Sequence, residues 1–349
     1  MKYQPTSIDV AEMAGVSQST VSRVLNGSAL VSADAQRQVL DAVQKLNYKI
    51  DSHARTLRSK RVCSLEVMVV EDMGNDYGVI NPFFLPMIGE IVRYARHKGY
   101  EVSVSFQKDD DSLLRNTCAS KPAEGIIFLA PKDFETYART TQGQDRYNGH
   151  WVIWGRDHTD LDTSCVVSDN EKGAFEAVRH LISHGRKRIA YLGKFSGEQW
   201  EFTERHAGYC SALRQAGIPR DDRLQLDAVL TLEGGAAAID RLMDTGTEFD
   251  AVFAATDVLG VGAMRRLAHH GFHVPDQVAV IGFDDLWICD TVTPRLSTVR
   301  QNTVIAGRVL VDSVEALIEG GTASTVKIPT ELVIRESCGG ASVLSTTLS

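Results

Sequence analysis

The chain has 349 residues, of which 43% are hydrophobic, and a formal net charge of −8. It is long enough for two or three domains and apolar enough to bury a sizeable core. Its six cysteines lie far apart without any C-x-x-C pair, which argues against a disulfide scaffold and a zinc module. The N-terminus is too polar for a signal peptide and no apolar run reaches membrane-spanning length, so we expect a cytoplasmic protein. We also expect that it needs no metal or cofactor.

Basic side chains are concentrated at the N-terminus. Residues 1–61 carry nine Lys or Arg and five Asp or Glu, a charge of +4, so the rest of the chain carries −12. A basic head on an acidic body is typical of a nucleic-acid-binding module whose remainder is kept away from the phosphates. A chance fluctuation in surface charge is the alternative, and the motifs must decide between the two.

Three short helices are predicted within the first fifty residues. We expect Ser7, Ser17 and Ser32 to cap their N-termini. Gly15 suits the tight turn between the first two helices, and Val16 can fill the angle between them. The apolar positions at helical spacing are Val10, Ala11 and Ala14, then Val21, Val24 and Leu25, then Ala35, Val39, Val43 and Leu46. This pattern predicts an all-α helix-turn-helix head.

The second predicted helix has a polar face that the core does not explain. Gln18, Ser19, Ser22 and Arg23 point away from its apolar positions. Short polar and bidentate side chains at the start of a helix are the types that read base edges in a major groove. An ordinary solvated face is the alternative, although Lys and Glu are more usual there. The face therefore favours DNA binding.

The stretch from Ile8 to Tyr48 resembles the DNA-binding head of the LacI/GalR family of bacterial transcription regulators, through AGVS, TVSRVLN and the closing LNY. The resemblance implies that Gln18, Ser19 and Arg23 contact bases. It also implies a set of phosphate contacts, namely Ser17, Thr20, Ser22, Asn26 and Ser32.

The segment DSHARTLRSKR, residues 51–61, reads on composition alone as a solvated linker. The family resemblance implies instead a hinge helix that forms on DNA and contacts the minor groove through Ala54, Arg55 and Leu57. Leu57 would be the apolar wedge that opens the central base step. Folding on DNA is reasonable because a helix of roughly eight residues is marginal alone.

The acidic body shows an alternation of short apolar runs and helical stretches, which predicts parallel sheets covered by helices on both faces. The expected strands are 65–70, 101–106, 125–130, 151–154, 189–192, 251–254 and 278–283. The expected helices are 84–98, 171–184, 203–215, 235–243, 258–270 and 304–318. About 280 residues are long for one such unit, so we expect two lobes. Ligands of open α/β sheets bind beyond the carboxyl ends of the strands.

Charged and aromatic side chains follow several of these strands. The candidate effector-binding residues are Phe83, Phe84, Arg156, Trp200, Arg205, Asp257 and Asp284. An Arg and an Asp together offer a donor fork and a pair of acceptors for vicinal hydroxyls, and an aromatic ring offers a stacking face. Each has an ordinary alternative: the aromatic residues could be core or loop packing, and the charges could be surface groups.

The family resemblance extends over the body to about Cys338, through NPFF, DNEKGA, HLISHGRKRIAYLG, ERHAGY, ATDVLGVGAM and VPDQVAVIGFDD. It implies a two-lobed, periplasmic-binding-protein-like effector domain with three crossovers between the lobes. By motif, Phe84, Arg205 and Asp284 fall on effector-contacting positions, with Phe83, Arg156 and Asp257 close behind.

We therefore expect a DNA-binding domain over residues 1–50, a hinge over 51–61, an effector-binding and dimerisation domain over 62–340 and a tail over 341–349. The tail lacks a leucine heptad, which favours a dimer over a tetramer. The helix 304–318 is expected to be either a crossover helix or part of a dimer face. The loop 71–80 is longer and more acidic than is usual in the family, and it could either close the mouth of the effector site or simply be mobile.

The function hypothesis is a dimeric transcription regulator, most simply a repressor, that binds near-palindromic operator DNA under the control of a sugar. A nucleobase corepressor is the main alternative for the effector, and inducer and corepressor logic are indistinguishable at this stage. An enzyme is disfavoured because no catalytic residue or motif such as GxSxG, HExxH or GxxxxGK[ST] is found. A stand-alone sugar-binding protein would not need a helix-turn-helix head.

Overall fold

The computed structural model of the chain divides into two compact units, Met1–Val62 and Cys63–Ser349, which we call the head and the body. It describes residues 5–25, 31–46, 64–71, 81–108, 123–129, 150–155, 163–195 and 200–340. Several predicted site residues lie outside these ranges, namely Asn26, Ala54, Arg55, Leu57 and Arg156. The loop 72–80 and the tail 341–349 lie outside them as well.

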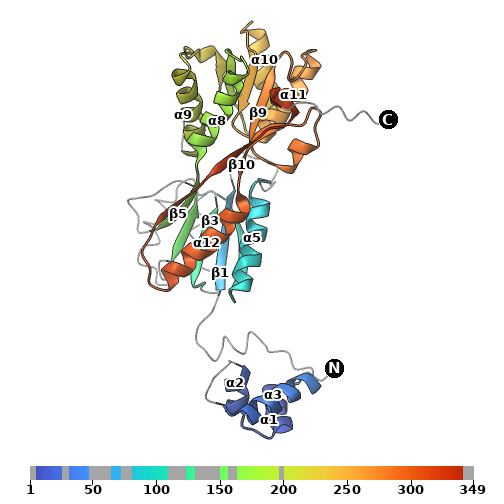
Figure 1. The fold of residues 1–349 in the computed structure, drawn as a ribbon, viewed down its shortest axis with the longest axis vertical. Helices are drawn as coiled ribbons and strands as arrows, with labels where there is room; N and C mark the ends of the chain where they lie inside the picture. The colour runs from blue at the N-terminus through green and yellow to red at the C-terminus, as the bar shows by residue number, and fades with distance from the viewer. Residues whose placement is uncertain are drawn as a thin grey trace, which may run out of the picture. The chain divides into compact units, whose positions relative to one another are not determined.

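The head consists of α1 (Ser7–Ala14), α2 (Gln18–Leu25) and α3 (Ala33–Lys45), shown in blue in Figure 1. Its core is small: Val10, Val21 and Val39 are fully buried, one from each helix. Val16 packs against this core from the turn between α1 and α2, as expected. The apolar residues at helical spacing therefore form one core, to which each of the three helices contributes a fully buried valine.

The cap of α1 differs from the expectation. Thr6, not Ser7, is the N-cap, and it forms a reciprocal capping box with Asp9, whose carboxylate accepts the Thr6 N–H at 2.6 Å. The pattern T-x-x-D satisfies two backbone donors at once, which the Ser7 register cannot do. Ser32 caps α3 as predicted, and the Ser17 hydroxyl accepts the Thr20 N–H at 3.2 Å.

The first lobe of the body is built on a parallel sheet. Its strands are, in spatial order, β11 (Thr325–Ile328), β5 (Ser164–Ser168), β4 (Trp151–Trp154), β3 (Gly125–Leu129), β1 (Ser64–Glu71) and β2 (Glu101–Lys108). The helices α5 (Phe84–His97) and α12 (Thr303–Ile318) pack on each other and cover the sheet (Figure 1). Their buried faces explain the apolar spacing of both segments.

The second lobe is built on a mixed sheet. Its spatial order is β12 (Thr330–Val333), β10 (Ser297–Gln301), β9 (Ala279–Asp284), β8 (Ala251–Ala254), β6 (Ile189–Leu192) and β7 (Gln225–Leu226). All neighbours are parallel except β12, which runs antiparallel to β10.

Both faces of the second sheet are covered. Along β6, Ile189 and Tyr191 join one core cluster while Ala190 and Leu192 join the other. The first cluster includes side chains of α8 (Asn170–Ser183) and α9 (Trp200–Gln215). The second includes side chains of α10 (Leu232–Asp244) and α11 (Asp257–His269), on the other side of the sheet in Figure 1. Burial on both faces is why these strands read as continuous apolar runs.

The chain passes between the two sheets three times, as the family resemblance implied. The crossovers lie between β5 and α8, between β10 and α12, and between β11 and β12. The predicted helix 304–318 thus follows the second crossover. No helix in the described part of the chain is long and apolar enough to span a membrane.

The turn between α1 and α2 gives a first prediction. Gly15 has φ +65°, a conformation that costs a residue with a side chain about 1–2 kcal/mol. We expect Gly15→Ala to lower the unfolding free energy of the head by about this amount. Gly89→Ala is the matched control, because Gly89 lies within α5 with no atom near the added Cβ and should be neutral or stabilising. Urea unfolding followed by circular dichroism measures both, and equal effects would refute the role of the turn.

Candidate functional site

The first turn of α2 is held by hydrogen bonds among the predicted DNA-contacting residues. The Ser17 hydroxyl lies 2.7 Å from that of Ser19 and 2.9 Å from that of Thr20. The Gln18 amide donates to the Ser7 hydroxyl at 2.8 Å, which ties α2 to α1. These contacts order the polar side chains before any ligand arrives. To contact a base, the Gln18 amide would have to give up its hydrogen bond to the Ser7 hydroxyl and form one to the base edge instead.

Among the described basic residues of the head, Arg23 is the one that forms no ion pair with a carboxylate. Arg37 pairs with Asp34 at 3.7 Å and Lys45 with Asp41 at 2.7 Å, both along α3. Arg23 is exposed on α2 and has no ion-pair partner among the described residues. Its guanidinium is therefore available for a guanine edge or a phosphate.

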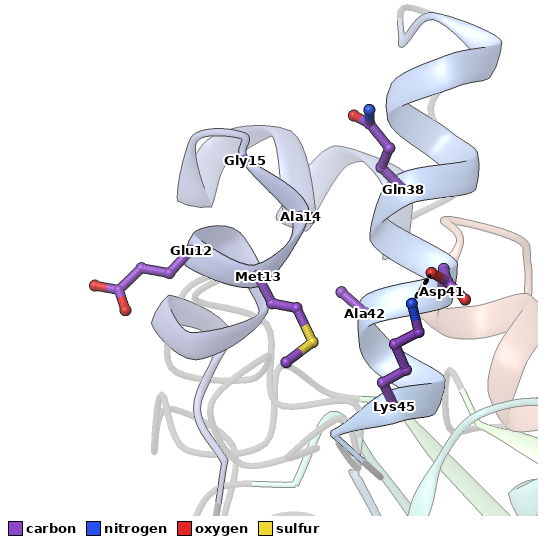
Figure 2. A pocket seen from close by; sticks show the side chains of 8 residues that line it. All are labelled: Glu12, Met13, Ala14, Gly15, Gln38, Asp41, Ala42 and Lys45. Carbon is purple, nitrogen blue, oxygen red and sulfur yellow. Dashed lines mark ion pairs between the residues drawn. The ribbon is translucent and has the colours of Figure 1, made fainter.

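A depression of about 290 Å³ lies elsewhere on the head, between α1 and α3 (Figure 2). Its lining residues are Glu12, Met13, Ala14, Gly15, Gln38, Asp41, Ala42 and Lys45. None of them belongs to α2 or to the residues predicted from the sequence to bind DNA or effector. Because it is open and lined mostly by surface side chains, we assign it no function.

In the body, Arg205 is the centre of a buried polar group at the carboxyl ends of the second sheet. Its Nε donates to Asn170 Oδ1 at 2.9 Å, and its Nη1 donates to the Ala255 carbonyl at 2.6 Å and lies 3.4 Å from Asp284 Oδ1. Arg205 is only 4% exposed, and its guanidinium lies over the Phe283 ring at 3.8 Å. The predicted Arg205 and Asp284 are thus brought together.

Asp284 is held in a strained conformation at the end of β9. Its φ is +119°, which a residue with a side chain rarely adopts, and Asp285 follows with φ +59°. The Gln301 amide donates to Asp284 Oδ1 at 2.6 Å, the same oxygen that faces Arg205. Backbone strain of this kind is concentrated at functional sites.

Sequence reasoning missed three members of this group: Ser168, Asn170 and Gln301. Asn170 donates to the Ser168 carbonyl at 3.1 Å and to Glu204 Oε2 at 3.2 Å. Ser168 ends β5 and Gln301 ends β10, so they stand at the first two crossovers. The signal that was available is the buried polar residue at the carboxyl end of a strand, but β5 and β10 were not predicted as strands. We call Asn170, Arg205, Asp284 and Gln301 the polar ring.

Asp257 lies behind the polar ring. It is fully buried, its Oδ1 accepts from the Thr298 hydroxyl at 2.5 Å and its Oδ2 accepts from the Leu286 N–H at 2.7 Å. A Cβ on Gly282 would collide with Asp257, so glycine is required there. With both oxygens engaged, Asp257 fixes the loop that follows Asp284. Direct contact between Asp257 and an effector stays a prediction.

The predicted aromatic residues divide between core and surface. Phe83 and Phe84 are 6% and 8% exposed and belong to the core of the first lobe, with their ring centroids 5.3 Å apart. Leu286, from the second lobe, joins the same cluster. Trp200 is 45% exposed on α9 and hydrogen-bonds Glu204. Contact of these rings with an effector remains a prediction.

Burial dominates the electrostatics of this region. It raises the pKa of Asp257 and of Asp284, and the Arg205 guanidinium partly offsets the rise at Asp284. Burial also raises the pKa of Glu201 and of Glu204 on α9. Burial therefore disfavours the ionised form of all four carboxyls.

Comparison with known proteins identifies both units. The model of the bacterial regulatory proteins, lacI family, matches residues 8–51, and that of a periplasmic binding protein-like domain matches residues 178–338. The chain is 31% identical to the HTH-type transcriptional regulator CelR of Thermobifida fusca, over 96% of this chain and 99% of CelR. The chain belongs to the LacI family of bacterial regulators. It is accordingly a DNA-binding transcriptional regulator and not an enzyme.

Solved structures of LacI-family proteins share the whole fold. A CelR–cellobiose complex matches with a TM-score of 0.71 and 28% identity, over 96% of this chain and 100% of that one. A lac repressor dimer bound to operator and an anti-inducer matches with a TM-score of 0.75 and 25% identity, over 96% and 99%. The helix-turn-helix head and the two-lobed α/β body predicted from the sequence are confirmed.

The raised pKa of Asp257 predicts a pH dependence of stability. The folded state holds the proton more tightly than the unfolded state, so the free energy of unfolding falls as the pH rises above about 4, the pKa of an unfolded Asp. Asp257→Asn keeps an acceptor for Leu286 and removes the charge. We expect it to gain stability over the wild type at pH 8 and less so at pH 5, in urea unfolding.

Asp240→Asn is the control for this measurement. Hydrogen bonds from Arg266 and His270 lower the pKa of Asp240, so removal of the Asp240 negative charge should destabilise the protein. An Asp257→Asn variant that is equally destabilised at both pH values would contradict the burial argument.

Proposed function

We propose that this LacI-family regulator is a repressor that binds a near-palindromic operator as a dimer in the cytoplasm. We further propose that a sugar bound between the lobes of each body, at the polar ring, controls operator affinity. The observation that carries the effector site is the buried contact between Arg205 and Asp284, with Asp284 in a strained conformation.

The DNA side of the proposal rests on α2. Gln18, Ser19 and Arg23 would contact bases, and the ordered hydroxyls of Ser17 and Thr20 would meet phosphates together with Ser22 and Ser32. Asn26 is a further predicted phosphate contact. The available charge of Arg23 supports this arrangement. The hinge contacts of Ala54, Arg55 and Leu57 remain predictions for residues that the structure does not describe.

The polar ring supports effector binding because of where it lies. Asn170 follows the first crossover and Gln301 precedes the second, while Arg205 and Asp284 belong to the second lobe. A ligand that hydrogen-bonds this ring would act on the segments that join the lobes. The CelR–cellobiose complex supports a sugar as the ligand class. Phe83, Phe84, Trp200, Arg156 and Asp257 are the further candidates for contact.

A dimer is supported by the lac repressor dimer and by apolar surface on this chain. Trp287 is 73% exposed, more than any other large apolar side chain among the described residues. Trp is enriched among the residues that contribute most to protein–protein binding, so Trp287 is a candidate for the dimer face. In a dimer formed through the bodies, each subunit would place its own head on one half of the operator.

Effector control requires only that the two lobe arrangements differ in their affinity for the sugar. Binding would then change the lobe angle, and with it the spacing of the two hinges. A coupling free energy of about 1–3 kcal/mol is typical of such linkage. The sign of the coupling distinguishes an inducer from a corepressor.

Substitution of Arg23 tests the DNA-reading role of α2. We expect Arg23→Ala to cost about 1–3 kcal/mol of affinity for an operator selected from random DNA, and to relax base preference at one position of each half-site. Arg37→Ala is the matched control, since Arg37 is exposed on α3 and already paired with Asp34. Fluorescence anisotropy at fixed salt measures both. Equal losses would mean that Arg23 contributes only general charge.

A further inference from the structure

We propose that Asp285 is a positioning residue of effector control, which carries a displacement of Asp284 to the segments that join the two lobes. This role rests on the effector site of the proposed function and specifies how that site acts on the rest of the body. Three features support it: both oxygens of Asp285 are held, the holding arginines belong to different parts of the body, and Asp285 shares a peptide with Asp284.

Both carboxylate oxygens of Asp285 accept from arginines. Oδ2 accepts from Arg300 Nε at 2.6 Å, and Oδ1 accepts from Arg335 Nη2 at 2.8 Å. The side chains of Asp285 and Arg335 are only 11% and 10% exposed. At this burial, the loss of either contact leaves a charge poorly compensated, which is costly. The Asp285 carboxylate therefore moves together with its two arginines.

Arg335 anchors Asp285 within the second lobe. Its Nη1 donates to the Leu296 carbonyl at 3.0 Å, its Nε donates to Asp290 Oδ1 at 2.8 Å, and its backbone N–H donates to the Ser297 hydroxyl at 2.8 Å. These partners lie in the short helix after β9 and at the start of β10. Arg335 is thus fixed from several directions and gives Asp285 a firm support.

Arg300 connects Asp285 to the crossovers. It is the residue before Gln301 at the end of β10, and its Nη1 donates to Glu331 Oε2 at 3.1 Å. Arg300 and Glu331 lie opposite each other on β10 and β12, just before the second crossover and just after the third. The polar ring stands at the first two crossovers through Asn170 and Gln301. The chain from Asp285 through Arg300 to Glu331 extends its reach to the third.

The backbone joins Asp285 to Asp284 directly. The two residues have φ +59° and +119°, and Asp284 lies opposite Arg300 in the pairing of β9 with β10. Few other conformations are open to two consecutive residues in this region. A ligand that displaces the Asp284 carboxylate therefore moves the shared peptide, and the Asp285 carboxylate passes this movement to Arg300. Chains of ion pairs between rigid elements are one physical route for such coupling.

Two variants interrupt this chain, and a third serves as a matched control. Asp285→Asn removes the charge at nearly constant size, and Asn tolerates a positive φ as Asp does. Arg300→Gln removes the link to the crossovers from a side chain that is 42% exposed. The control is Arg295→Gln, because Arg295 is 55% exposed and paired with Glu336 two residues before β10, at the opposite end of the same strand. Circular dichroism checks that all three fold.

The first measurement separates sugar binding from its consequence in the full-length protein. The probes are cellobiose, galactose and trehalose, with calorimetry for sugar affinity and fluorescence anisotropy for affinity to an operator selected from random DNA. We expect Asp285→Asn and Arg300→Gln to bind the sugar, and to reduce the change that it produces in operator affinity by a factor of roughly 2 to 30. Arg295→Gln should respond like the wild type. An unreduced response in both variants would overturn the role of Asp285, as would a loss of sugar binding itself.

The second measurement needs no sugar. Amide hydrogen exchange of the ligand-free protein should be at least about twofold faster in residues 299–303 and 328–333 of Asp285→Asn and Arg300→Gln than in the wild type. Exchange in β6 is the internal reference, because it would rise as well if the whole body were destabilised. Unchanged exchange at both crossovers would refute the chain of contacts, whatever the sugar does.

The two levels of the proposal fail in different ways. If none of the three sugars binds the wild type while exchange rises as expected, the sugar effector of the proposed function fails and the role of Asp285 at the crossovers is supported. If a sugar binds and controls the wild type and both variants equally, the effector site stands and the role of Asp285 is wrong.

Discussion

The contact between the Arg205 guanidinium and the Asp284 carboxylate is the interaction on which the account depends. Both side chains are buried, so each charge requires the other, and the loss of one partner of such a pair typically costs about 3–5 kcal/mol. Asn170 accepts from Arg205 and Gln301 donates to Asp284, and both stand at crossovers between the lobes. The same four side chains thus hold the end of the second sheet and the segments that join the lobes.

The surrounding fold makes this arrangement possible. Parallel strands place their carboxyl ends at one edge, so residues distant in sequence converge there. Behind Asp284, the buried Asp257 fixes the following loop, and Gly282 gives Asp257 the room it needs. Asp284 can then keep an unfavourable φ, because its neighbours determine its position. A ligand that competes for the ring acts on a strained and buried group, which is a suitable point for coupling to the lobe angle.

Much of this could be predicted from the sequence, and the failures have physical reasons. The strands 189–192 and 251–254 were recognised because burial on both faces makes them continuous apolar runs, and 65–70 is interrupted only by Glu66. β10 carries Ser, Thr, Arg and Gln, and β12, at the sheet edge, carries Thr and Glu, so neither was found. Arg205 and Asp284 were predicted because they come after the recognised strands 189–192 and 278–283. Ser168, Asn170 and Gln301 were missed because their importance depends on the crossovers, which have no local pattern. Thr6 was missed because a capping box needs its partner, Asp9.

The most direct test of the central claim is the effect of sugar on operator affinity in the wild type and in Asp284→Asn. The operator is one selected from random DNA, and the sugar is the one that stabilises the protein most. We expect the sugar to change wild-type affinity by roughly 5–150-fold, in either direction. Asp284→Asn should be less stable because Arg205 loses its buried partner, but its folded fraction, checked by circular dichroism, should still bind the operator without sugar and lose the response. A variant that responds like the wild type would contradict the account, as would a wild type that binds sugar without any change in operator affinity.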